Sequence, residues 1–243
     1  MIQLGHDLNT YEVRYKMINS IVERNRFTSP ITETERKILQ SAIRLFLENG
    51  YSQTTIRAIS ADCGLRQGTI AYHFHAKEDM LYYLIQALTE FHGGIIDNGL
   101  EQSKDVLFSY AAEISIQIAL CETNRKAWDL YYSAYSQFKT FEFIKNWAAK
   151  EHNMLFAERL PDWKESDFFE KEHITSGIEL AVFYAPCDRF FTLEKKISLT
   201  LDSLMLLYNV SEEERKQTIE KILKLDCVKI GQEMFEKFVS RIL

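Results

Sequence analysis

The stretch TTIRAISADCGLRQGTIAYHF, residues 54–74, decides the fold of this 243-residue chain. Thr54 or Thr55 can cap a first short helix, because a hydroxyl at this position accepts a hydrogen bond from a free amide of the first turn. Gly64 then permits a sharp turn, since a positive φ costs little only for glycine. A second short helix is expected over about residues 66–72. The pattern predicts two short helices that meet at a steep angle.

The two faces of this helix pair carry different residues. The inward positions are apolar or small and belong to the core whatever the pair does: Ile56, Ile59, Ser60, Leu65 and Ile70. The outward positions of the second helix are Arg66, Gln67, Thr69, Ala71 and Tyr72. A helix exposed in this way fits the major groove of DNA. The stretch therefore predicts a helix-turn-helix that reads duplex DNA.

The rest of the chain favours helices as well. Nine Gly and three Pro are few for a chain of this length, and apolar residues recur at helical spacing. Thr32 or Thr34 can cap a helix that ends at Asn49-Gly50. Further helices are predicted over about residues 77–98, 104–122, 125–138, 141–160, 166–185, 192–208 and 212–241. The expected fold class is all-α.

Residues 33–83 resemble the TetR/AcrR family of bacterial transcriptional regulators. The resemblance rests on ETERKILQSAIRLFLENGY, TTIRAISADCGLRQGTIAYHF and KEDML. It implies an N-terminal three-helix helix-turn-helix DNA-binding domain, followed by a larger helical domain that binds an effector and dimerises. The chain then divides into a partly helical extension at residues 1–31, a DNA-binding domain at 32–80, and an effector-binding and dimerisation domain at 81–243.

The resemblance also implies which residues contact DNA. Thr55 is similar to the family's phosphate-binding helix cap, and Arg57 to a backbone or groove contact. Gln67 and Thr69 correspond to base-reading positions, where Gln can pair with adenine and Thr can touch a thymine methyl. The expected DNA-binding residues are Thr55, Arg57, Arg66, Gln67, Thr69, Tyr72, His73 and Lys77.

Several of these positions leave a structural alternative open. Tyr72 and His73 end the recognition helix, where they either approach phosphates or pack. Lys77 opens a helix, where a cation opposes the helix dipole, so a phosphate bound there would explain it. The family's usual Tyr is Ala71 here, and its usual Ser at the start of the recognition helix is Arg66. These departures affect the contacts to the operator, not the fold.

Aromatic residues concentrate in the C-terminal part. Twenty-four of the 31 lie after residue 80, and WDLYYSAYSQF, residues 128–138, holds several. They could line an apolar effector pocket in which the tyrosine hydroxyls form hydrogen bonds, or they could simply pack in the hydrophobic core. The candidate ligand-binding residues are Trp128, Tyr131, Tyr132, Tyr135 and Phe138. The effector itself is unknown.

A homodimer is expected because one recognition helix reads few bases. The apolar helices near residues 166–185 and 192–208 would pair across a two-fold axis into a four-helix interface. Two recognition helices held about 34 Å apart can then read both halves of a palindromic operator in double-stranded DNA. A helix over 77–98 would link the two domains and carry the effector's signal.

Charge and cysteine usage agree with this interpretation. The net charge is −6, but residues 1–80 carry +1 and residues 81–243 carry −7, so the acidity lies outside the DNA-reading part. The cysteines lie far apart and form no CxxC pair, which predicts reduced thiols and no metal site. Neither a signal peptide nor an apolar run of membrane-spanning length is found, so a cytoplasmic protein without a membrane partner is expected.

An enzyme is the main competing class. Glu170 and His173 have the Glu-x-x-His spacing of di-iron helical bundles, but the sequence has no second copy. Motifs for phosphate binding or nucleophilic catalysis are missing, so we expect no enzyme and no cofactor.

The predicted function is a DNA-binding transcriptional regulator, a repressor released from its operator by a small-molecule effector. A transcriptional activator, or a helical DNA-binding factor without an effector, remains an alternative.

Overall fold

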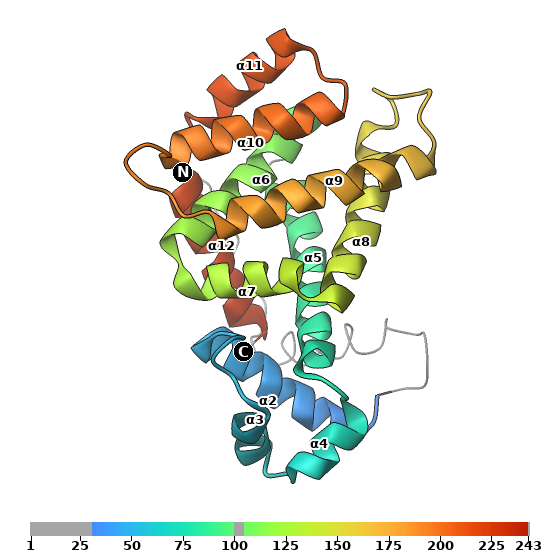
Figure 1. The fold of residues 1–243 in the computed structure, drawn as a ribbon, viewed down its shortest axis with the longest axis vertical. Coiled ribbons are helices and arrows are strands. Elements are labelled where there is room, and N and C mark those ends of the chain that lie inside the picture. The colour runs from blue at the N-terminus through green and yellow to red at the C-terminus, as the bar shows by residue number, and fades with distance from the viewer. Residues whose placement is uncertain (1–30, 100–104, 243) are drawn as a thin grey trace.

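The structure, a computed structural model, describes residues 31–99 and 105–242, with the side chains of 93–99 excluded. Within these residues it contains eleven helices and no strand, which confirms the all-α prediction (Figure 1). The predicted N-terminal extension, residues 1–31, lies outside the described residues except for Ile31.

Three helices form a head at one end of the molecule (Figure 1). They are α2 (Glu33–Asn49), α3 (Ile56–Cys63) and α4 (Gln67–His73). Of the two threonines predicted to cap α2, Thr32 is the cap: its hydroxyl accepts from the Glu35 amide, and the Glu35 carboxylate accepts from the Thr32 amide at 2.7 Å. This reciprocal arrangement satisfies two amides that the first turn would otherwise leave free.

The larger lobe is built from eight helices. They are α5 (Lys77–Gly99), α6 (Val106–Thr123), α7 (Arg125–Ser136), α8 (Phe138–Phe156), α9 (Glu165–Tyr184), α10 (Leu193–Leu207), α11 (Glu212–Ile222) and α12 (Cys227–Ile242). Figure 1 shows α5 rising from the head into this lobe, so one helix belongs to both parts.

Helix α6 is the core helix of the larger lobe. It contacts α12, α11, α7 and α10. Among the described helices it alone is long and apolar enough to cross a membrane by length and composition, and 67% of it is buried inside the structure. Its apolar surface is therefore covered by neighbouring helices, as expected for the centre of a helical core.

Two predicted helix boundaries are wrong. The helix predicted over residues 212–241 is two helices, α11 and α12, because Asp226 accepts from the Lys229 amide and caps a new helix without any Gly or Pro nearby. The break predicted between residues 138 and 141 lies instead at Gln137. There the Thr140 hydroxyl donates to the carbonyl of Ala134 at 2.6 Å, which satisfies an acceptor at the end of α7.

One apolar core connects the head with the larger lobe. It includes Phe46 of α2, Leu84 of α5, Leu130 of α7 and Phe238 of α12. The domain boundary predicted at residue 80 falls inside α5, and packing continues across it. The division into domains therefore remains a prediction about function.

A buried carboxylate holds the head to α7. Asp129 Oδ2 accepts from the Ser52 amide at 2.9 Å, in the turn that follows α2. Gly50 has φ +94°, and a Cβ there would lie 3.1 Å from the same Asp129 oxygen. Glycine therefore permits both the backbone conformation and the close approach.

We expect Asp129→Ala to lower the free energy of unfolding by about 1–3 kcal/mol, because the Ser52 amide loses its acceptor in a partly buried contact. Hydrogen exchange at the Ser52 amide should accelerate, while exchange in α4 stays unchanged. Denaturant unfolding and exchange measured by NMR check this. Asp129→Asn keeps an acceptor oxygen and serves as the control. Unchanged protection of the Ser52 amide in the alanine variant would contradict the role given to Asp129.

Candidate nucleic-acid interface and ligand cavity

The recognition helix α4 lies at the free end of the head, opposite the larger lobe (Figure 1). Its Ile70 is fully buried, while Arg66, Gln67 and Tyr72 are exposed and Thr69 is partly exposed. The helix therefore anchors itself through one face and offers the other to solvent. This matches the outward face predicted from the sequence.

Local sequence explains how α3 and α4 meet. Gly64 ends α3 in the left-handed conformation with φ +67°. The Ser60 hydroxyl donates to the Leu65 carbonyl at 2.5 Å, so a small polar residue satisfies the backbone of the turn. Ile59 is fully buried and Cys63 nearly so, and both belong to the same core as Ile70. These contacts fix the angle at which α4 leaves the head.

Thr55 and Arg57 lie at the start of α3. The Thr55 side chain accepts from the Ala58 amide at 3.1 Å, which makes it the cap of this helix, and it remains exposed. Arg57 is exposed on the first turn. Both side chains are open to solvent in the same head as α4, as a phosphate contact requires.

Tyr72 and His73 end α4 in different environments. Tyr72 is 81% exposed, and its ring meets the His73 ring edge-on at 5.1 Å. His73 Nδ1 lies 3.2 Å from Glu35 Oε1, which ties α4 to α2. Burial opposes ionisation of Glu35, but hydrogen bonds from Thr32 and His73 outweigh it and lower the pKa of the carboxyl. The geometry thus favours packing for His73 and leaves Tyr72 free.

Lys77 opens α5, as predicted, and its side chain contacts the backbone of the head. Its Nζ donates to the Tyr51 carbonyl at 2.7 Å and to the Thr54 carbonyl at 2.9 Å. It also lies 4.0 Å from the centre of the Tyr51 ring. Burial lowers the pKa of the ammonium, and the charge of Asp129 opposes this. The contacts explain a cation at this helix start without a phosphate, and they give Lys77 a structural role in holding the turn before α3.

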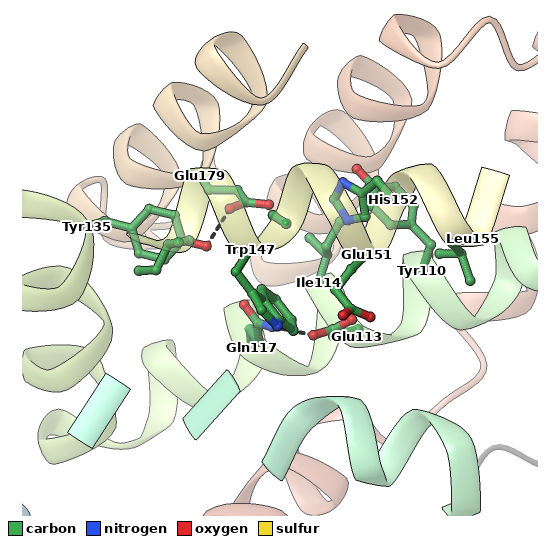
Figure 2. A pocket seen from close by; sticks show the side chains of 12 residues that line it. Tyr110, Glu113, Ile114, Gln117, Tyr135, Trp147, Glu151, His152, Leu155 and Glu179 are labelled. Atoms are coloured by element: carbon green, nitrogen blue, oxygen red, sulfur yellow. Dashed lines mark hydrogen bonds between the residues drawn. The ribbon is translucent and has the colours of Figure 1, made fainter. Parts of the chain in front are cut away.

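A cavity of about 130 Å³ lies between α6, α7, α8 and α9 (Figure 2). Of the five residues predicted to bind an effector, only Tyr135 lines it. The lining residues are Tyr110, Glu113, Ile114, Gln117, Tyr135, Ile144, Trp147, Ala148, Glu151, His152, Leu155 and Glu179. The cavity is therefore built mainly by α6 and α8, and of these two helices the aromatic run of residues 128–138 contains only Phe138, the first residue of α8.

The other four predicted ligand residues lie elsewhere. Trp128 Nε1 donates to the Phe183 carbonyl at 2.7 Å, and its ring stacks on Tyr132 at 5.1 Å. Tyr131 is buried, with its hydroxyl 2.7 Å from His92 Nε2. Phe138 is 78% exposed. Successive residues of a helix point in different directions, so a consecutive aromatic run cannot line a single cavity.

One sequence signal for the cavity was missed. Glu113 stands inside SYAAEISIQIAL, residues 109–120, as a single charge in an apolar helix. A charge in such a run is seldom buried unless it has a partner or a function. By contrast, Glu170 and His173 are exposed on α9, and the described part of the chain brings no three potential metal ligands together.

The carboxylates of the cavity have defined partners. Glu179 Oε2 accepts from the Tyr135 hydroxyl at 2.5 Å, as Figure 2 shows. Burial, and next the charge of Glu172, raise the pKa of Glu179 to about 7. Glu113 Oε1 accepts from Gln117 at 3.2 Å. The cavity therefore holds carboxyl groups of different ionisation, because near neutral pH Glu179 carries only part of a negative charge.

Comparison with known proteins supports a regulator. Residues 38–84 match the family model described as bacterial regulatory proteins, tetR family. An uncharacterized HTH-type transcriptional regulator, YerO of Bacillus subtilis (strain 168), is 30% identical over 82 residues, which cover 32% of this chain and 28% of YerO. A second one from the same organism, YwcC, is 22% identical over 219 residues, which cover 82% of this chain and 96% of YwcC.

Two further proteins extend the comparison. The IcaR negative transcriptional regulator of the icaADBC biofilm operon, from Staphylococcus aureus (strain Newman), is 28% identical over 85 residues, or 34% of this chain and 46% of IcaR. The solved structure of SmeT, the repressor of the Stenotrophomonas maltophilia multidrug efflux pump SmeDEF, is 16% identical with a TM-score of 0.48, covering 72% of this chain and 89% of that one. Residues 38–84 therefore carry a helix-turn-helix similar to that of the tetR family of bacterial regulatory proteins, and its recognition helix is exposed.

Proposed function

We propose that the protein represses transcription by binding a palindromic operator as a homodimer, and that a small-molecule effector releases it. The observation that carries the proposal is the exposed face of α4, which presents Arg66, Gln67 and Tyr72 at the free end of the head. In this proposal the DNA-contacting residues are Thr55, Arg57, Arg66, Gln67, Thr69 and Tyr72.

These side chains would have different roles in DNA recognition. Gln67 and Thr69 lie on the first turn of α4, the part of a recognition helix that contacts base edges. Arg57, Arg66 and Tyr72 would contact phosphates, which position the protein without reading sequence. Because the chain as a whole has a net charge of −6, local cations of the head must supply the attraction to DNA.

An apolar face on α9 and α10 supports the dimer. Ile174 is 56% exposed on α9 and Leu199 is 60% exposed on α10. Gly177 and Ala181 are also exposed, and a Cβ at Gly177 would meet nothing within 4 Å. Small residues beside large apolar ones let a second helix pair approach closely. Figure 1 shows α9 and α10 side by side on one face of the larger lobe, so both helices can join one interface.

Two helices connect the cavity with the head. On α7, Tyr135 donates to Glu179 in the cavity, while Asp129 accepts from the Ser52 amide in the head. On α5, His92 contacts the Tyr131 hydroxyl and Gln117, and Gln117 donates to Glu113 in the cavity. A ligand that moves α7 or α5 would therefore shift the head. Release follows only if the ligand binds the DNA-free conformation more tightly than the bound one.

Selection of bound duplexes from a random pool tests the proposal. We expect enrichment of one palindromic sequence whose half-sites are about one helical turn apart, because two heads related by a two-fold axis read equivalent bases. Transcription in vitro from a promoter carrying the selected site separates repression from activation. No enrichment over bulk competitor DNA at moderate salt would refute the proposal.

A further inference from the structure

The cavity between α6, α7, α8 and α9 is lined by acidic side chains. Its described lining includes three carboxylates, Glu113, Glu151 and Glu179, and neither Lys nor Arg. Its one histidine is already engaged, because His152 Nδ1 lies 2.7 Å from the carboxylate of Glu172 and 2.9 Å from the Tyr208 hydroxyl. The positive charge that His152 can carry is thus matched by Glu172. Glu113 faces Gln117 and His92, whose Nδ1 lies 3.6 Å from Glu113 Oε1, and Glu179 faces the Tyr135 hydroxyl, so these two carboxyls line the cavity without a Lys or Arg beside them.

A second feature of the cavity is an unsatisfied hydroxyl. Tyr110 lines the cavity and is 2% exposed, and its hydroxyl has no hydrogen-bond partner among the residues that the structure describes. A buried polar group without a partner costs free energy that a bound molecule can recover. Burial, followed by the charges of Glu172, Glu179 and Glu113, raises the pKa of this hydroxyl, so it stays a donor.

The third feature is aromatic lining beside the carboxylates. Tyr110, Tyr135 and Trp147 come from three different helices and border the same space (Figure 2). The face of an aromatic ring attracts a cation, most strongly where water is excluded. Carboxylates and aromatic rings around one enclosed volume are the combination that recognises an ammonium group.

We propose that this cavity binds a small organic cation, with its ammonium group beside Glu113 and Glu179 and a hydrogen-bond acceptor within reach of Tyr110. The inference rests on the proposed function in one respect: it identifies this ligand as the effector. A volume of about 130 Å³ suits a compact molecule, since a cavity of roughly this size holds benzene. Anionic ligands are disfavoured, because they would add to the negative charge.

Protonation of Glu179 links cation binding to pH. Its pKa of about 7 means that the carboxyl loses much of its charge on mild acidification. The groups that act on it are Tyr135 on α7, His152 on α8, Glu113 on α6 and Glu172 on its own helix. A cation favours the ionised form, so affinity should rise as the pH increases through about 7.

Isothermal titration of the full chain with permanently charged probes tests the proposal. Choline and phenyltrimethylammonium are compared with their neutral carbon isosteres, 3,3-dimethylbutan-1-ol and tert-butylbenzene. Because the probes do not titrate, any pH dependence belongs to the protein. We expect at least one cation to bind about tenfold more tightly than its isostere. Its affinity should be higher at about pH 8 than at about pH 6, on either side of the pKa of Glu179.

Two substitutions identify the site. Glu179→Gln keeps an acceptor for the Tyr135 hydroxyl and removes the charge, so it should weaken cation binding about tenfold, flatten the pH dependence and leave the neutral isostere unaffected. Glu170→Gln, exposed on the same helix, is the matched control and should change nothing. Circular dichroism checks that both variants fold.

Three outcomes would overturn the inference: neutral isosteres that bind as tightly as the cations, cation affinity that survives Glu179→Gln, or no binding of either cation at millimolar concentration. Different results would refute the proposed function. A cation that binds the cavity but leaves operator affinity unchanged supports the ligand class and refutes release by an effector. Failure to bind any duplex refutes the regulator and leaves the titration result intact.

Discussion

Ile174→Glu combined with Leu199→Glu is expected to convert the protein into a monomer and to remove high-affinity operator binding. Both side chains are exposed on the apolar face of α9 and α10. In a two-fold interface each new carboxylate appears twice, so four negative charges would enter one desolvated patch. A single head then binds one half-site without the gain from linkage, which lowers operator affinity by about 10²- to 10⁴-fold.

Light scattering after size exclusion measures the mass, and fluorescence anisotropy with the selected duplex measures the affinity. Leu223→Glu is the matched control, because Leu223 is also an exposed leucine but follows α11, away from α9. It should leave both mass and affinity unchanged. A double variant that stays dimeric would place the interface on another face of the molecule.

The second large effect is expected for Gln67→Ala and concerns operator binding. If Gln67 forms two hydrogen bonds to one base, its loss should weaken operator binding by about 1–3 kcal/mol, or about 5- to 150-fold. It should also relax specificity at one position of each half-site, since the neighbouring contacts remain. Fold stability should not change, because the side chain is exposed and Ile70, which anchors α4, is untouched.

Comparison with Arg57→Ala separates base reading from phosphate contact. Loss of a phosphate contact should weaken binding to all duplexes alike and reduce the salt slope by about one per head. Gln40→Ala, an exposed glutamine on α2 of the same head, is the control. Repeating the duplex selection with each variant shows the difference. An unchanged sequence preference with Gln67→Ala would mean that α4 does not read bases through this residue.

The head was predictable from the sequence because its determinants are local. Gly64 supplies the turn, Thr55 caps α3, and Ile59 and Ile70 alternate with exposed residues at helical spacing. Each of these effects acts over a few residues, so a short window contains the whole cause. Long-range contacts were not readable in this way. Lys77 is an example, since its ammonium reaches carbonyls 23 and 26 residues earlier in the chain.

The C-terminal lobe was less predictable from the sequence than the head. Its helices were predicted from apolar periodicity, yet the junction of α11 and α12 was missed because only Asp226 marks it. The cavity was missed because its walls come from four helices whose relative rotation depends on packing. Of the aromatic run at residues 128–138, only Tyr135 reaches the cavity, while Trp128 is drawn to the Phe183 carbonyl on α9.

The sequence by itself determined that this protein is all-helical and carries a helix-turn-helix at residues 54–74, because turn, caps and helical faces are properties of neighbouring residues. Only the tertiary structure decided which side chains share a space. In the folded chain Lys77 donates to a backbone carbonyl, and Asp129 accepts from the Ser52 amide. Glu113 and Glu179 line one cavity. The physical reason is that a helix can turn about its axis without altering its own hydrogen bonds, so only packing against other helices fixes where each side chain points.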